Sequence, residues 1–245
     1  MHTTGDEETA REVTQRYSAF ALVFNRIAWG GRRASSFALL IIAAIVAGVC
    51  PPSPGVQARA AEVRILAFGD SLTAGYGLTA SESFPSQLER ALRARGIEAK
   101  VINGGVSGDT SAAGLARLEW ALGEKPDAVI VCLGANDMLR GLDPTKMEDN
   151  LDKILQRIGA RHLPVLLAGM LASPNLGEEY TRQFNSVFPR LAEKHNAVFY
   201  PFFLDGVATQ VQLNQTDGMH PNAQGVAIIV ERILPRVTEL LDKRG

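Results

Sequence analysis

The sequence predicts an α/β protein in which a five-stranded parallel sheet lies between two layers of helices, a three-layer α/β/α sandwich. Two observations predict it: there are five short apolar runs typical of buried strands, and segments with helical spacing separate them. Right-handed connections between such strands make the sheet parallel and cover both of its faces. The composition, 46% hydrophobic and 21% charged, is that of a globular protein and excludes a disordered or fibrous chain.

The predicted elements alternate regularly along residues 61–245. Each strand is a short run of mostly apolar residues, and each helix repeats apolar residues three and four positions apart. Gly69 and Gly134 end the first and third strands, and Pro221 suits the first turn of the last helix. The strands are expected at 63–68, 99–103, 128–133, 164–169 and 197–200, and the helices at 82–95, 110–123, 145–159, 178–195 and 221–242.

Residues 1–60 are predicted to be a targeting region outside the fold. Several arginines precede an uncharged apolar run of thirteen residues at 37–49, and Ala58-Arg-Ala60 offers a small-residue cleavage site. Together these features indicate a secretory signal peptide, so we expect an exported, periplasmic or secreted domain of residues 61–245. A retained membrane anchor at 37–49 is the alternative, but thirteen helical residues span about 20 Å, less than a ~30 Å hydrocarbon core.

Charge and cysteine content argue against nucleic-acid binding and against a disulfide-rich fold. The formal net charge is −1, from 25 Lys and Arg against 26 Asp and Glu, and gives no indication of nucleic-acid binding. Two cysteines are too few for a disulfide scaffold. Cys50 falls in the targeting region, and Cys132 lies in an apolar run, which predicts a buried structural thiol. The sequence does not determine the oligomeric state.

Polar clusters follow three of the predicted strands, and a fourth precedes the last helix. They are 69–73, 104–110, 134–137 and 217–221. Because parallel strands end at the same edge of a sheet, and ligands of such sheets bind beyond that edge, we expect all four clusters to converge there.

A serine, a histidine and an aspartate in these clusters suggest nucleophilic catalysis. Ser71 follows the first strand, and a serine hydroxyl needs a base. His220 lies at the same edge, whereas His162 and His195 lie elsewhere and are expected to be solvated. Asp217, three residues before His220, can orient one ring nitrogen while the other faces the serine. The alternative is that Asp217 only caps the last helix.

Acyl transfer also needs hydrogen-bond donors for the oxyanion. The N–H of Ser71, a glycine N–H from cluster 104–110 and the amide of Asn136 are the candidates. Asp70, Asp109 and Asp137 have a different possible use, since acids after parallel strands can bind Mg²⁺ for phosphoryl chemistry. Such acids more often cap turns and helices, so we expect no metal.

The order and spacing of the four clusters resemble those of the SGNH (GDSL) hydrolases. Gly69-Asp-Ser-Leu72 is similar to the first block of that family, Gly108 to the second, Gly134-Ala-Asn-Asp137 to the third and Asp217-Gly-Met-His220 to the fifth. The longer strings 69–76, 106–111 and 114–118 resemble the secreted thioesterase I, lysophospholipase and arylesterase subgroup. Ala135 stands where that subgroup often has glycine.

The resemblance implies a flavodoxin-like sheet and a set of site residues. Ser71 would be the nucleophile, His220 the base and then the acid, and Asp217 its orienting partner. The N–H groups of Ser71 and Gly108 and the side-chain amide of Asn136 would bind the oxyanion. No cofactor and no metal are implied.

The function that follows is hydrolysis of small-molecule carboxylic esters or thioesters. Transient contact of the protein with membrane lipid is compatible with such substrates. By the same resemblance, Leu139, Leu142 and residues 171–177 would line an acyl groove. A carbohydrate O-deacetylase on the same scaffold is the alternative enzyme. A metal-dependent phosphohydrolase and a non-catalytic lipid- or glycan-binding protein are alternatives from other classes.

Overall fold

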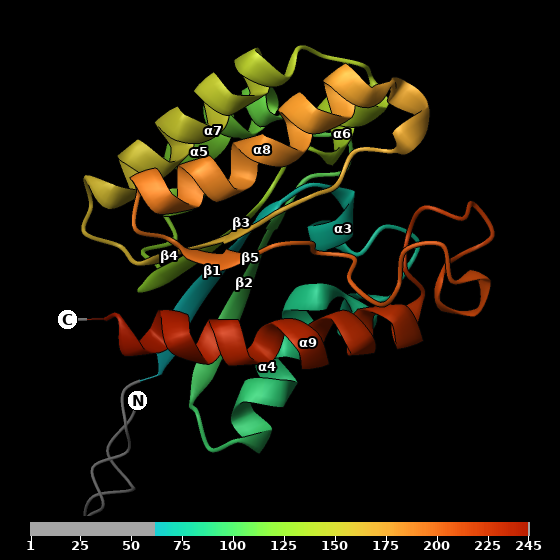
Figure 1. Cartoon of the computed structure of the whole chain (residues 1–245). Coiled ribbons are helices and arrows are strands. Elements are labelled where there is room, and N and C mark those ends of the chain that lie inside the picture. Colours follow the sequence, from blue (N-terminus) through green and yellow to red (C-terminus); the bar gives the residue numbers. More distant parts are fainter. Residues whose placement is uncertain (1–61, 245) are drawn as a thin grey trace, which may run out of the picture. The chain divides into compact units, whose positions relative to one another are not determined.

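A five-stranded parallel sheet forms the centre of the part that the computed structural model describes, residues 62–244 (Figure 1). The predicted α/β fold is confirmed, and the strand order β2-β1-β3-β4-β5 is the flavodoxin-like one. All four neighbouring pairs are parallel, and β1 pairs with both β2 and β3. The strands are β1 (Val63–Gly69), β2 (Ala99–Gly105), β3 (Ala128–Cys132), β4 (Val165–Ala168) and β5 (Val198–Tyr200).

Helices cover both faces of this sheet. In Figure 1, α5, α7 and α8 lie on one face, and α4 and α9 lie on the other. The five long predicted helices are all present, and their ends agree with prediction to within two residues. The helices are α3 (Ser71–Ala74), α4 (Phe84–Ala94), α5 (Ser111–Leu122), α6 (Ala135–Leu139), α7 (Pro144–Gly159), α8 (Glu178–Lys194) and α9 (Ala223–Asp242). Three short 3-10 turns are η1 (Ala80–Glu82), η2 (Pro174–Leu176) and η3 (Val211–Leu213).

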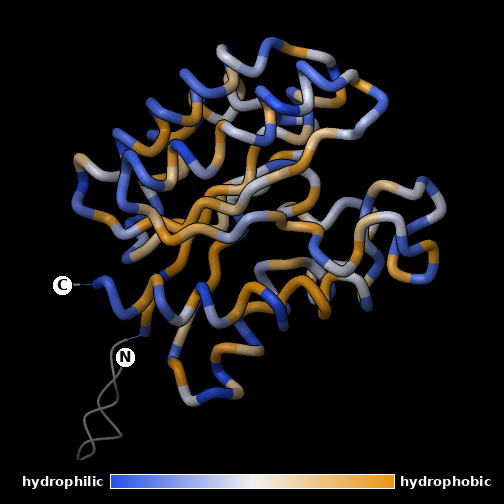
Figure 2. Tube along the Cα trace, viewed as in Figure 1, coloured by the Kyte–Doolittle hydropathy of each residue, from blue (hydrophilic) through white to orange (hydrophobic). Residues whose placement is uncertain are grey.

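The hydrophobic core lies along the strands and on the helix sides that face them, as the orange segments of Figure 2 show. The central strand β3 is buried at every position, because helices cover both of its faces. The edge strand β2 alternates between buried and exposed residues. Cys132, at the end of β3, is buried as predicted, and burial raises the pKa of its thiol well above the usual value.

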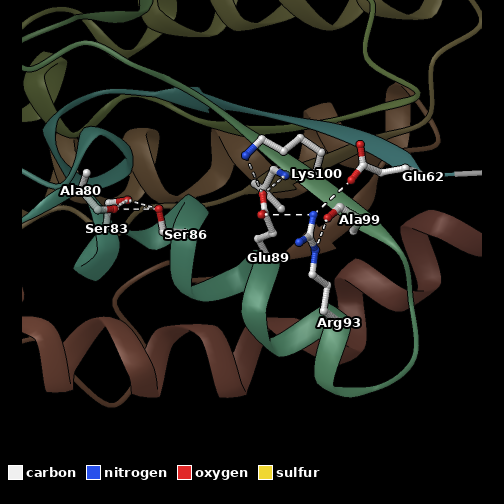
Figure 3. Close-up of polar contacts among 9 residues, drawn as sticks. Glu62, Ala80, Ser83, Ser86, Glu89, Arg93, Ala99 and Lys100 are labelled. Atoms are coloured by element: carbon white, nitrogen blue, oxygen red, sulfur yellow. Dashed lines mark hydrogen bonds and ion pairs between the residues drawn. The ribbon is translucent and has the colours of Figure 1, made fainter. Parts of the chain in front are cut away.

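Side chains of α4 cover the open edge of β2 (Figure 3). Glu89 accepts a hydrogen bond from the N–H of Val101 at 2.9 Å, and Arg93 donates from Nε to the carbonyl of Ala99 at 2.9 Å. Glu89 and Arg93 also contact each other at 3.4 Å. Lys100 lies 3.3 Å from Glu89, and Glu62 lies 3.1 Å from Arg93. These backbone groups face away from β1 and would otherwise depend on water.

The last helix begins later than predicted. Its N-cap is Asn222, whose side-chain oxygen accepts the N–H groups of Gln224 and Gly225. Pro221 lies before the helix and forms an isolated antiparallel bridge with Asn214. The loop before α9 is therefore held at both ends, which fixes the position of the residues just before Pro221.

The predicted targeting region, with its apolar run at 37–49 and Cys50, lies outside the described residues. Between residues 62 and 244, no helix is both long and apolar enough to cross a membrane.

Candidate active site

The carboxyl edge of the sheet brings the four polar clusters together, because each one follows a strand or precedes α9 at that edge. Ser71 begins α3 directly after β1, and Gly108 lies between β2 and α5. Asn136 lies in α6, which follows β3. The loop 217–220 returns to this edge from the far end of the chain.

Three side chains from these clusters form a hydrogen-bonded relay. Nε2 of His220 lies 2.9 Å from Oγ of Ser71, although the two residues are 149 positions apart in the sequence. Nδ1 of His220 lies 2.6 Å from Oδ2 of Asp217. An imidazole held in this way can accept the serine proton while the carboxylate fixes its tautomer and orientation. The side chains of His220 and Asp217 remain 18% and 32% exposed, so a substrate can reach them.

Asp217 is held by its own loop rather than by the last helix. Its Oδ1 accepts the backbone N–H groups of Met219 at 2.9 Å and His220 at 3.0 Å. The hydrogen bonds from the His220 and Met219 N–H groups, followed by that from the His220 ring, lower the pKa of Asp217 to about 2. The carboxyl is thus ionised at neutral pH. The alternative in which Asp217 caps α9 is wrong, since Asn222 caps that helix.

Tyr76 is a neighbour of His220 that the sequence reasoning did not single out. Its ring centroid lies 4.7 Å from that of His220 with an interplanar angle of 37°. The carbonyl of Tyr76 accepts a hydrogen bond from Nε2 of Gln215, which also donates to the carbonyl of Pro221. These contacts tie the loop after α3 to the loop that carries His220. The only available signal was its place at the end of the string 69–76.

The other two histidines of the described chain lie away from this site, as expected. His162 is exposed, in agreement with the prediction of a solvated ring. His195 is different, because its side chain is only 16% exposed and Nε2 contacts Oδ1 of Asp152 at 2.6 Å. The expectation of a solvated His195 is therefore wrong: α7 supplies a carboxylate that the sequence spacing does not reveal.

Buried Asp70 and partly buried Asn136 form a hydrogen-bonded pair beside Ser71. Asp70 caps α3 by accepting the N–H of Leu72 at 3.0 Å, and its second oxygen accepts from Nδ2 of Asn136 at 3.2 Å. Burial raises the pKa of Asp70 to about 6, against the opposing effect of these two hydrogen bonds. Because a carboxylate only accepts, it fixes which end of the Asn136 amide carries the nitrogen. One N–H of that amide remains for another acceptor.

Gly108 occupies a backbone conformation that favours glycine. Its φ is +87°, while a Cβ there would meet only Nη2 of Arg140, at 3.8 Å. The requirement for glycine is therefore conformational rather than steric. Nη2 of Arg140 donates to the carbonyl of Gly108 at 2.7 Å, which links the end of α6 to the loop between β2 and α5.

The remaining acids after the strands are bound within the protein. Asp109 pairs with Nε of Arg117 at 2.5 Å. Asp137 accepts the N–H and the hydroxyl of Ser111 at 2.7 and 2.6 Å. Over residues 62–244, no group of three or more His, Cys, Asp or Glu side chains is placed to hold a metal ion.

Exposed apolar side chains concentrate around this edge. Within residues 62–244, all the large exposed apolar residues except Trp120 lie between the carboxyl end of a strand and the next long helix. The predicted groove residues Leu139 and Leu142 are 60% and 41% exposed. The others are Tyr76, Val106, Leu171, Leu176, Val211 and Met219.

Comparisons with known proteins identify related sequences and structures. The profile of the GDSL-like Lipase/Acylhydrolase family matches residues 67–228. The chain is 38% identical to Esterase TesA of Pseudomonas aeruginosa over 184 residues, which cover 75% of this chain and 92% of that protein. It is 36% identical to Thioesterase 1/protease 1/lysophospholipase L1 of Escherichia coli over 187 residues, 76% of this chain and 88% of that one. The crystal structure of AlinE4, an SGNH-hydrolase family esterase, matches with a TM-score of 0.63 and 50% identity over 74% of this chain and 97% of its own.

Proposed function

The chain belongs to the GDSL-like lipase/acylhydrolase family and is a hydrolase of ester bonds, and from this premise we propose that it is an exported serine esterase with Ser71 as its nucleophile. The observation that carries the proposal is the relay in which His220 lies 2.9 Å from the Ser71 hydroxyl and 2.6 Å from Asp217. Each member of the relay has the partner that its role requires.

The reaction has two halves. His220 accepts the Ser71 proton as Oγ attacks the carbonyl carbon, and the tetrahedral intermediate collapses when His220 gives that proton to the leaving alcohol or thiol. A water molecule, deprotonated by His220, then attacks the acyl-enzyme, and Ser71 regains its proton as the acid leaves. Asp217 stabilises the imidazolium that forms in both halves.

The oxyanion is bound by donors from three segments at the carboxyl edge of the sheet. Ser71 is the first residue of α3, so its N–H has no acceptor within that helix. Asn136 contributes the N–H of its amide that Asp70 does not engage. Gly108 contributes a backbone N–H, in a turn whose carbonyl Arg140 holds. Removal of one such donor typically lowers kcat by about 10²–10³.

The substrate class is carboxylic esters or thioesters with a short to medium acyl chain. The exposed apolar residues around the relay, among them Leu139, Leu142 and Leu171, provide a surface for such a chain. Relatives named esterase and thioesterase/lysophospholipase support the same class. The apolar edge also permits transient contact with lipid that holds the substrate.

Export is the proposed role of residues 1–60, on the basis of their arginines, apolar run and Ala58-Arg-Ala60 site. N-terminal sequencing of the protein recovered from the periplasm or medium is expected to begin at Ala61. A full-length chain in the membrane fraction would instead favour an anchor at 37–49.

The test of the catalytic assignment is Ser71→Ala. We expect this variant to lose p-nitrophenyl ester hydrolysis and fluorophosphonate labelling while its circular dichroism and melting temperature stay unchanged. Full activity in the variant would overturn the assignment. A series of esters from acetyl to long acyl chains, with acetylated glycans beside it, then separates an acyl esterase from an O-deacetylase.

A further inference from the structure

Arg117, on α5, contacts two segments of the candidate active site at once: the end of β1 and the loop between β2 and α5. Its Nη2 donates to the carbonyl of Gly69 at 2.9 Å, and its Nε donates to Oδ2 of Asp109 at 2.5 Å. Gly69 ends β1 two residues before Ser71, and Asp109 directly follows Gly108. One guanidinium therefore joins the segments that carry two of the three oxyanion donors in the proposed function.

The environment of this guanidinium is more restrictive than that of a surface ion pair. The side chains of Arg117 and Asp109 are only 17% and 11% exposed. The Arg117 guanidinium carbon lies 4.3 Å from the centre of the Phe68 ring, a cation–π contact that fixes its plane. Its Nη1 is buried and has no hydrogen-bond partner in the described part of the chain.

The unpartnered Nη1 adds no hydrogen bond within the described part of the chain, so the guanidinium acts through its other two nitrogens. Nε contacts Asp109 and Nη2 contacts Gly69. The planar fork of the guanidinium holds these two contacts at a fixed separation.

Backbone hydrogen bonds connect the same two segments. The carbonyl of Gly69 also accepts the N–H of Val106 at 3.0 Å, and the carbonyl of Val106 accepts the N–H of Asp109 at 3.1 Å. Residues 106–109 thus form a turn attached to the end of β1. Arg117 spans that turn from Gly69 to Asp109 and sets where Gly108 lies relative to Ser71.

We propose that Arg117 is a positioning residue that maintains the separation between the Ser71 and Gly108 N–H groups, and so the geometry of the oxyanion site. This inference rests on the proposed function. It assigns Arg117 no contact with substrate, and its effect reaches the reaction through Gly69 and Asp109. Misplacement of a catalytic group by about 1 Å can lower a rate by about 10²-fold.

The test compares Arg117→Lys, Arg117→Met and Asp109→Asn with wild type. A matched control is Arg161→Met, which breaks an exposed ion pair between Arg161 and Glu119, a residue of α5 two positions after Arg117. The measurements are kcat and KM for a p-nitrophenyl ester, the first-order rate of inactivation by a p-nitrophenyl phosphonate, and the melting temperature of each variant.

We expect Arg117→Lys to keep a melting temperature near that of wild type, because the lysine retains the charge next to Asp109. We also expect its kcat and its inactivation rate to fall together by about 10–10²-fold with KM little changed, since a single ammonium does not reproduce the two-pronged contact. Asp109→Asn is expected to show the same pattern more weakly, and Arg161→Met to match wild type in kcat.

A purely structural ion pair predicts a different result, in which lysine restores both stability and kcat. That outcome, or a loss of activity in all variants that follows only the loss of folded protein, would overturn the inference. If Arg117→Met does not fold, the lysine and Asp109→Asn variants still decide it. Wild-type enzyme that resists fluorophosphonate labelling would instead reject the proposed function itself.

Discussion

Replacement of Asp70 by asparagine tests the electrostatics of the site through stability and activity together. Asp70 is 1% exposed, and its burial raises the pKa of the carboxyl from 3.8 to about 6. The folded protein therefore holds a proton that the unfolded chain releases between these two values. Because the native state binds more protons than the unfolded state there, native stability falls as the pH rises from about 4 to 6.

The magnitude follows from the same two pKa values. They correspond to about 3 kcal/mol of stability that wild type loses across this interval. Asp70→Asn has nearly the same shape but does not titrate, so it does not suffer this loss. We expect the difference in unfolding free energy, variant minus wild type, to rise by about 3 kcal/mol between pH 4 and pH 7.

Urea unfolding at half-unit pH intervals measures this difference, and the pH-independent effect of the substitution cancels from its slope. Asp217→Asn is a control with the opposite sign, because the pKa of Asp217 is lowered to about 2. The contribution of Asp217 to wild-type stability is retained above pH 4 and lost as the pH falls toward 2. A variant-minus-wild-type difference for Asp70 that is flat from pH 4 to 7 would refute the reasoning.

The same Asp70→Asn variant is expected to lose activity. The new amide nitrogen would face the Asn136 nitrogen across the present 3.2 Å contact, and two donors repel. Relief comes from a reversal of the Asn136 amide, which replaces the proposed oxyanion donor with an oxygen. We expect kcat to fall by up to about 10²–10³-fold with KM little changed.

Further predictions concern four single sites. Asn136→Ala is expected to lower kcat by about 10²–10³ at similar KM, whereas a change confined to KM would assign the residue to substrate binding. Gly69→Ala is expected to destabilise the fold by about 1–3 kcal/mol in urea, since its Cβ would lie 2.2 Å from Oγ1 of Thr73. Gly159→Ala, with nothing within 4 Å at the end of α7, should instead stabilise by about 0.5–1 kcal/mol, and equal effects at the two sites would contradict the packing. Iodoacetamide is expected to label buried Cys132 only in denaturant, and rapid labelling of the native protein would show an access path.

The sheet and its long helices were predictable from the sequence because local pattern decides them. Strand β3 is apolar at every position, and the helix over 144–159 repeats its apolar residues on one side. The convergence of Ser71 and His220 was predictable for a topological reason, since parallel strands end at one edge. The contact between Asp217 and His220 needs only the local geometry of loop 217–220.

Contacts between distant polar side chains were not predictable in this way. The pairs Asp109 with Arg117 and Asp152 with His195 join residues whose spacing carries no periodic signal that distinguishes them from surface charges. The start of α9 was misplaced because Pro221 suits a first helical turn, while the bridge from Asn214 to Pro221 is a tertiary contact. Such contacts depend on how loops pack after the sheet has formed.

The covering of the β2 edge by side chains of α4 has a consequence for self-association at high protein concentration. The Val101 N–H and the Ala99 carbonyl are already bonded to Glu89 and Arg93, so a strand from a second molecule would have to displace these two side chains to pair there. Strong acid would protonate the glutamate and release one of those bonds. Ordered, fibre-like self-assembly through this flank should therefore set in at low pH and be suppressed near neutrality.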